Sequence, residues 1–190
     1  MRIFFACFIA LACVSLASCV TFMDAVSEEP IQPDPSRRSF GNYWDDKRLA
    51  TIVRVNLNKA DPRFDELNIN VYAFNAVVLL TGQAPDAHLR ELAADTARKI
   101  NNVRQVYNEI TVDSTRGLGG GIQDKWLGTR LKTKLMAYKD IQSGRVKVFT
   151  ENRTVYLMGL LTHEQADRVT EVVRNDKGVR KVVRAIEYID

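Results

Sequence analysis

The chain contains two copies of one unit, and this duplication restricts the possible fold more than any other feature of the sequence. Five residues of the segment that begins at Asp46 recur 78 positions later, in the segment that begins at Asp124. The first set is Asp46, Lys47, Leu49, Thr51 and Leu57, and the second is Asp124, Lys125, Leu127, Thr129 and Leu135. The sequence is therefore a tandem repeat, in which one unit folds twice.

Two later motifs extend the repeat to the end of the chain. The pattern Asn-x-x-Val-x-Leu-x-Gly spans residues 75–82 and returns 77 positions later at residues 152–159. Three apolar residues return 76 positions later: Val103, Val106 and Ile110 as Val179, Val182 and Ile186. Because the spacing falls by one residue at each step, the copies differ by small changes in loop length.

The first copy predicts a helix, a β-hairpin, a second helix and a last strand. Leu49 to Leu57 carry an apolar residue at every fourth position, which forms one helical face, and Asp45 or Asp46 is a plausible cap. Apolar or alternating runs at residues 67–74 and 77–81 meet at Asn75-Ala76 and predict the hairpin. A helical pattern opened by Pro85 and a strand over residues 106–112 complete the unit.

The second copy repeats this order. Its first helix begins at Asp124, and Thr162 followed by Gln165 predicts a capping box at the start of its second helix. Its strands are predicted at residues 146–150, 154–158 and 182–189. The sequence thus predicts an α+β protein with two α-β-β-α-β modules, at residues 44–113 and 122–190. The glycine-rich residues 114–121 link them.

The N-terminal residues predict export and lipidation. Residues 1–18 are apolar after Arg2, too short to span a bilayer, and typical of a signal peptide. Leu16-Ala17-Ser18-Cys19 resembles the lipobox of bacterial lipoproteins, in which the cysteine is acylated after cleavage, with palmitate among the acyl chains. The alternative is a chance cysteine beside an ordinary signal peptide. If Cys19 is acylated, Cys7 and Cys13 leave with the signal, and no thiol remains.

The residues after Cys19 predict a flexible tether and an outer-membrane location. Residues 19–43 include Pro30, Pro33 and Pro35 and show no helical or alternating period. In lipoproteins an aspartate directly after the acylated cysteine favours the inner membrane, whereas this chain has Val20. That resemblance implies a protein anchored to the outer membrane by lipid and facing the periplasm.

The repeated residues resemble the BON domain family. The resemblance lies in the amphipathic helix with Thr51 or Thr129, in the two hairpin motifs, and in the closing residues 178–182, Gly-Val-Arg-Lys-Val. The first copy differs there, with Asn102 in place of Gly178. Two copies behind a lipobox are similar to dual-BON outer-membrane lipoproteins. That resemblance implies a non-enzymatic protein that binds phospholipid and supports envelope integrity.

The basic residues of the second copy favour an anionic membrane surface as its partner. Residues 46–112 carry nine Lys plus Arg against eight Asp plus Glu, whereas residues 124–190 carry fourteen against nine. An exported chain meets little nucleic acid, so no nucleic-acid partner is expected. Anionic headgroups attract each nearby Lys or Arg by about 1 kcal/mol. For most of these residues, a solvated charged surface is the simpler interpretation.

Trp126 is the leading candidate for lipid contact. It lies about 140° around the helix from the leucine face, where an amphipathic ring suits the headgroup level. The sequence predicts a membrane-contact patch of Trp126, Arg130 and Lys134, with Lys132 and Lys125 adding positive charge. The alternative is burial of the ring against the other module or the turn at residues 136–138. In the first copy the same face carries Arg48, Ile52 and Val55, which favours an interdomain role.

The sequence gives little support to catalysis. Its two histidines, His88 and His163, lie near predicted helix starts, and the glycines at 119–121 follow no phosphate-binding context. No enzyme activity, metal or cofactor is expected, although a carboxylate-rich metal site stays open. The competing hypothesis is an adaptor that docks on an outer-membrane assembly, secretion or division complex. An exposed sheet edge, or Ile52 with Val55, would then receive the partner.

Overall fold

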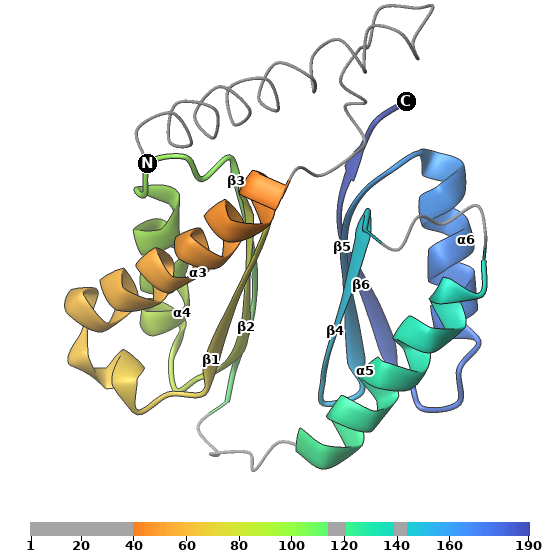
Figure 1. Ribbon diagram of the computed structural model, residues 1–190. Coiled ribbons are helices and arrows are strands. Elements are labelled where there is room, and N and C mark those ends of the chain that lie inside the picture. Colours follow the sequence, from red (N-terminus) through yellow and green to blue (C-terminus); the bar gives the residue numbers. More distant parts are fainter. Residues whose placement is uncertain (1–39, 114–120, 139–143) are drawn as a thin grey trace, which may run out of the picture. The chain divides into compact units, whose positions relative to one another are not determined.

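The structure is a computed structural model that describes residues 40–113, 121–138 and 144–190 (Figure 1). The predicted signal peptide, Cys19, most of the predicted tether and most of the predicted linker lie outside these ranges. None of the helices within the described ranges is both long and apolar enough to cross a bilayer.

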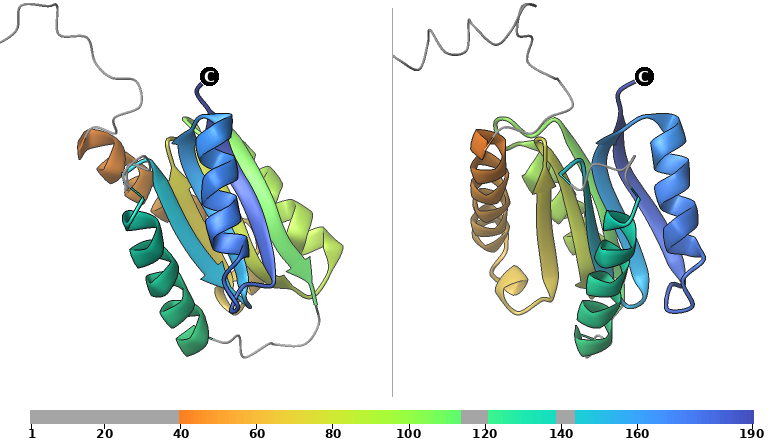
Figure 2. Two further views of the ribbon diagram at one scale, coloured as in Figure 1. Left: turned by 90° about the vertical axis from the view of Figure 1, so that its right-hand side faces the viewer. Right: turned by 45° about the vertical axis from the view of Figure 1, so that its right-hand side comes forward.

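The first copy folds as a three-stranded sheet with two helices on one face (Figures 1 and 2). Its elements are α3 (Phe40–Ala60), η1 (Pro62–Asp65), β1 (Ile69–Phe74), β2 (Val77–Ala84), α4 (Ala87–Arg98) and β3 (Gln105–Val112). β1 pairs with β2 antiparallel, and β2 pairs with β3 parallel, so the sheet is mixed. The predicted order is confirmed, with the short 3-10 helix η1 as an addition that the periodicity did not indicate.

The second copy has the same topology. Its elements are α5 (Gly121–Met136), β4 (Val146–Glu151), β5 (Thr154–Leu161), α6 (His163–Arg174) and β6 (Lys181–Tyr188). β4 and β5 are antiparallel, β5 and β6 are parallel, and α5 and α6 cover one face (Figure 2). The Thr162 hydroxyl accepts from the Gln165 amide and the Gln165 side chain from the Thr162 amide, which confirms the predicted capping box.

Two buried aspartates join the first helix of each copy to its hairpin, and for Asp46 this corrects the predicted role as a cap. α3 begins at Phe40, ahead of Asp46. The Asp46 carboxylate instead accepts hydrogen bonds from the amides of Asn75 and Ala76, at 3.0 and 3.1 Å. Both turn residues have positive φ, so the turn points its two amides at the carboxylate.

The second copy repeats this contact in full. The Asp124 carboxylate accepts from the amides of Asn152 and Arg153, at 2.7 and 3.0 Å, and both of these residues also have positive φ. A buried carboxylate that receives two backbone N–H groups fixes the position of the helix against the hairpin. The recurrence of Asp46 as Asp124 therefore has a structural cause.

Each copy has its own apolar core between the helices and the sheet. The core of the first copy includes Val53 and Leu57, which are fully buried, and Phe64 from η1. The core of the second copy includes Leu127, Leu131 and Leu135, the predicted face of α5. The helical spacing of these residues therefore identified core positions correctly.

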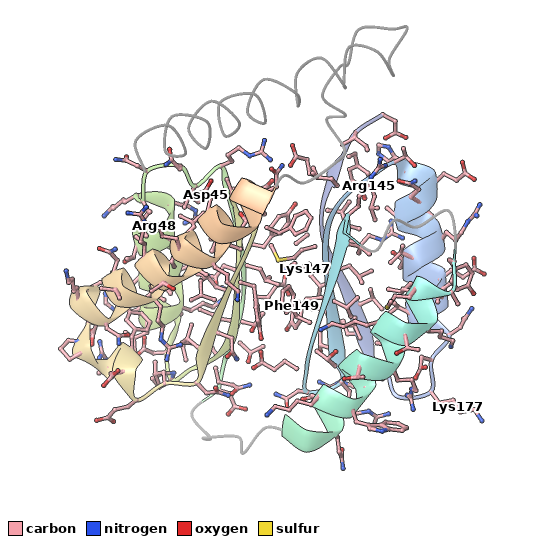
Figure 3. The ribbon with its side chains drawn as sticks, in the orientation of Figure 1. Asp45, Arg48, Arg145, Lys147, Phe149 and Lys177 are labelled. Atoms are coloured by element: carbon pink, nitrogen blue, oxygen red, sulfur yellow. The ribbon has the colours of Figure 1, made fainter. Side chains whose placement is uncertain are left out.

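The central strands β2 and β5 are buried on both faces, which indicates that the helix-free face of each sheet is also covered. A third apolar cluster joins the two copies there; its buried members are Phe74, Val77, Leu79, Tyr156, Met158, Leu160 and Ala185. Figure 3 shows that Lys147 and Phe149 leave β4 on the face away from α5. The ring of Phe149 stacks on Tyr72 with 3.9 Å between centroids.

Glu151 places polar contacts within this apolar junction. Glu151 accepts a hydrogen bond from the Thr81 hydroxyl at 2.5 Å and one from the Asn70 amide at 3.4 Å. Its other carboxylate oxygen is buried without a hydrogen bond. The equivalent residue of the first copy, 77 positions earlier, is the buried Phe74. Glu151 is therefore a specific feature of the second copy rather than of the repeated unit.

Candidate lipid-contact surface on helix α5

Trp126 projects from α5 into solvent. Its side chain is 66% exposed, so its predicted alternative, burial against the other copy or the turn at 136–138, is wrong. The cause is its position on the helix, since Leu127, Leu131 and Leu135 occupy the buried face. The exposed indole ring is therefore available to a partner surface, with an apolar body and a polar N–H.

Arg130 lies over the Trp126 ring, as the helical spacing predicts. Its guanidinium carbon is 4.6 Å from the ring centroid, which is a cation–π contact. The same guanidinium donates a hydrogen bond to Asp176, at the end of α6. Lys134, one turn further along α5, brings its ammonium group to 3.6 Å from the other oxygen of Asp176. Trp126, Arg130 and Lys134 thus form one cluster, with Asp176 as a member that the sequence did not predict.

Asp176 is buried beside these cations and stays ionised. Burial by itself would raise the pKa of Asp176, but the Gly178 amide and Arg130 hydrogen bonds, with the charges of Arg130 and Lys134, hold this pKa below its ordinary value. The carboxylate is 8% exposed. It fixes Arg130 against α6, and Arg130 in turn fixes the face of the tryptophan ring.

Gly178 makes room for this arrangement. A Cβ at Gly178 would lie 2.8 Å from a Leu127 methyl group and 2.9 Å from the Arg130 guanidinium. The first copy has Asn102 at this position, with φ of 70°, and Ile52 at the position of Arg130. The difference between glycine and asparagine in the two closing motifs is therefore explained by the side chain that crosses above it.

Lys125 and Lys132 lie on a different side of α5 from the Arg130 cluster. Both line a cavity of about 630 Å³ beside β4, which Asp124, Thr129 and Glu151 also line. The structure therefore divides the predicted patch into two parts: Trp126, Arg130 and Lys134 around Asp176, and Lys125 with Lys132 beside β4. Both lysines are exposed, so their charges contribute to the field at the outward face of α5.

Met136 is a second exposed apolar side chain of α5 that the sequence analysis did not single out. It is 69% exposed at the C-terminal end of the helix. Its exposure could have been predicted from the sequence. At about 100° per residue, Met136 lies outside the leucine face and at nearly the same angle around the helix as Lys125 and Lys132. The outward face of α5 therefore carries an apolar group near each end, with cations between them.

The first copy keeps the scaffold of this surface but none of its functional groups. Asp46, Leu49 and Leu57 match Asp124, Leu127 and Leu135. The residues equivalent to Trp126, Arg130, Lys134 and Asp176 are Arg48, Ile52, Asn56 and Ile100. The first copy therefore forms the same fold without this cluster.

The exposed face of α3 also corrects one prediction. Ile52 is 39% exposed and Val55 is 46% exposed, and neither belongs to the cluster that joins the copies. Their predicted interdomain role is therefore wrong. A groove of about 840 Å³ lies beside Arg48, Ile52 and the turn at residues 75–76. Figure 3 marks Arg48 on this helix.

In the part of the chain that the structure describes, the possible metal ligands form no metal site, and His163 makes structural contacts. No cluster of three or more His, Cys, Asp or Glu residues there is arranged to hold a metal ion. His163 stacks on Tyr188, with 3.9 Å between ring centroids, and its ring nitrogen lies 2.7 Å from Asp190. Hydrogen bonds from the His163 backbone and ring lower the pKa of Asp190. These contacts tie the C-terminus to the start of α6, which is a structural task.

Comparison with known proteins places this arrangement in a family. The chain is 41% identical over 160 residues to the 21 kDa hemolysin of Actinobacillus pleuropneumoniae, covering 84% of this chain and 80% of that protein. It is 31% identical to the outer membrane lipoprotein DolP of Haemophilus influenzae, covering 84% and 82%. It is 28% identical to the osmotically-inducible protein Y of Escherichia coli, covering 78% and 75%.

The family model described as the BON domain matches residues 45–114 and again residues 123–190. These two matches fall on the two α-β-β-α-β units, and they include both hairpin motifs and both buried aspartates. The chain therefore belongs to the BON domain family and carries two copies of the domain.

Proposed function

We propose that this protein is a non-enzymatic outer-membrane lipoprotein that binds anionic phospholipid through its second BON domain and supports envelope integrity. The observation that carries the proposal is the exposed Trp126, 66% accessible, with Arg130 stacked on its ring at 4.6 Å. Tryptophan is suited to the headgroup level of a bilayer, because its ring is apolar and its N–H can reach water or a phosphate.

The charges of α5 support an anionic surface as the partner. Lys125, Arg130, Lys132 and Lys134 all lie on this helix, and Met136 adds a second apolar group at its end. A helix that carries both cations and exposed apolar side chains binds membranes by combining the two interactions. The free energy from the cations falls as salt rises, because salt screens exposed charges.

The anchor and location rest on the sequence and on the relatives. Cys19 follows a lipobox-like segment, and acylation there would keep the protein on the membrane whether or not α5 binds lipid. The relative from Haemophilus influenzae is named an outer membrane lipoprotein. The proposed location is the outer membrane, with the protein facing the periplasm. Mass spectrometry of the N-terminal peptide tests the acylation.

Vesicle co-sedimentation tests the proposed lipid binding. Residues 20–190 are mixed with phosphatidylglycerol or phosphatidylcholine vesicles at low and moderate salt. We expect binding to phosphatidylglycerol that weakens with salt, and a loss of at least tenfold in the double variant Trp126→Ala, Arg130→Glu, from one ring and two units of charge. A matched double variant, Arg48→Glu with Ile52→Ala, alters the equivalent face of α3 and should bind as the wild type does. Unchanged binding by the folded double variant Trp126→Ala, Arg130→Glu contradicts the proposal.

A protein adaptor is the second candidate, and one observation favours it. Ile52 and Val55 are exposed apolar residues on α3, and Ile52 lines the groove of about 840 Å³. An exposed apolar surface beside a groove favours docking of an envelope protein there over permanent exposure to solvent. Crosslinking from position 52 in intact cells tests it. One stoichiometric partner, retained after detergent removes lipid, supports the adaptor, and lipid-only adducts count against it.

A further inference from the structure

Asp176 holds two of the cations that the proposed membrane contact needs. One of its oxygens accepts a hydrogen bond from the Arg130 guanidinium and another from the Gly178 amide at 3.1 Å. The other oxygen lies 3.6 Å from the Lys134 ammonium. The carboxylate thus occupies, on Arg130 and Lys134, the place that a phosphate oxygen of a lipid headgroup would take, because guanidinium groups bind both anions in the same way.

We propose that Asp176 is an intramolecular competitor of lipid phosphate, which limits the affinity of α5 for anionic membranes and keeps the contact reversible. The inference rests on the proposed lipid binding by α5. Two cations and one carboxylate leave a net charge of one at the cluster. When α5 reaches a lipid phosphate, Arg130 and Lys134 leave the Asp176 carboxylate and bind the phosphate. The free energy gained from the phosphate is reduced by the loss of the contacts with Asp176.

The geometry permits this exchange. The Arg130 side chain is 37% exposed and the Lys134 side chain 44%, so both reach solvent while they contact the carboxylate. The Arg130 Nε is buried without a hydrogen bond, so the guanidinium leaves one donor unused in its present position. Arg130 also covers the Trp126 ring, so release of the guanidinium frees the face of the ring that is to enter the headgroup layer.

The repeat indicates that the fold does not require Asp176. The first copy builds the same α-β-β-α-β unit with Ile100 at this position, Ile52 in place of Arg130 and Asn56 in place of Lys134. An acid therefore occurs where the cations occur. If its only task were to end α6, no link between the acid and the two cations of another helix would be expected.

The substitution Asp176→Asn separates this role from a structural one. Asparagine keeps an oxygen acceptor for the Gly178 amide but no longer neutralises the cations. We expect the protein of residues 20–190 with this change to bind phosphatidylglycerol vesicles about fivefold more tightly at low salt. This is the gain in affinity from one added cation near an anionic surface. The salt dependence should also become steeper. Phosphatidylcholine vesicles should show no such gain.

Asp167→Asn is the matched control, since it makes the same change in net charge on α6 itself, whereas Asp176 lies in the turn after that helix. Asp167 pairs with Arg184 and its side chain is 71% exposed. We expect less than a twofold gain from it. Equal gains in the two variants would show that net charge alone matters, and would overturn the proposal. A third variant, Asp176→Asn with Arg130→Gln, should lose most of the gain because the released guanidinium is gone.

Tryptophan emission provides an independent readout. The chain has two tryptophans, Trp44 and Trp126, so the change Trp44→Phe leaves Trp126 as the sole reporter. Vesicles should shift the emission of Trp126 to the blue at lower lipid concentration in Asp176→Asn than in the parent. Wild-type binding with no gain in the folded Asp176→Asn protein overturns this inference alone. Absence of binding in every variant overturns the proposed lipid function and this inference with it.

Discussion

At the scale of single residues, the two copies show which positions the fold demands. Asp46 and Asp124 each receive two backbone amides of a hairpin turn and are buried, at 6% and 7% exposure. Hydrogen bonds to a charged group stabilise by about 1.5–3 kcal/mol each. The sequence identified the recurrence of these aspartates but predicted a cap role for Asp46, because the contact from helix to turn spans about thirty residues and depends on tertiary packing.

The change Asp46→Ala should lower the free energy of unfolding by about 3 kcal/mol, because it leaves the two turn amides without their charged acceptor. Urea denaturation followed by circular dichroism measures this loss. Asp45→Ala is the control, since Asp45 is the exposed neighbour on the same helix and should change stability by less than about 0.5 kcal/mol. Equal losses in both variants would show that helix charge, and not the turn contact, sets the stability.

At the scale of elements, helical spacing predicted α5 well and its surroundings less well. The leucine face, the exposed tryptophan and the Arg130 contact all follow from a turn of about 100° per residue. Asp176 was not predicted, because it lies in the turn after α6 and approaches α5 only through packing of α5 and α6. The division of Lys125 and Lys132 from the rest of the patch has the same origin, since β4 lies beside only one side of the helix.

Two apolar residues of α5 should respond in opposite ways to truncation. Leu131 is fully buried, so Leu131→Ala should cost about 2–5 kcal/mol of stability through lost contacts and a cavity. Met136 is 69% exposed, so Met136→Ala should change stability by less than about 0.5 kcal/mol. Thermal or urea unfolding measures both. A large loss with Met136→Ala would mean that this side chain packs against the protein in solution.

At the scale of the whole described unit, contacts between the two copies were the part that the sequence could least predict. Spacing predicted apolar strands, but neither the residues that pack between the two copies nor the position of Glu151 could be read from it. Burial raises the pKa of Glu151 more than the hydrogen bonds from Thr81 and Asn70 lower it. The folded protein therefore binds this proton more tightly than the unfolded chain.

Because of Glu151, the free energy of unfolding should fall as pH rises. A raised pKa adds stability below the ordinary value of the carboxyl, and this contribution is lost as pH rises through the raised pKa. Glu151→Gln removes the titration, so its stability relative to wild type should increase between about pH 4 and about pH 7.5. Urea unfolding at both pH values measures this. Glu164→Gln, with a side chain 83% exposed, is the control and should show no such trend.

The apolar faces that join the copies also affect how the protein is made. Synthesis runs from the N-terminus, so the first domain can be complete while the second is still being made. During that interval Phe74, Val77 and Leu79 have no sheet to cover them. The nascent first domain then exposes an apolar surface that favours aggregation. A chain truncated at the linker would expose that surface permanently. Each domain therefore acts as the solubilising partner of the other.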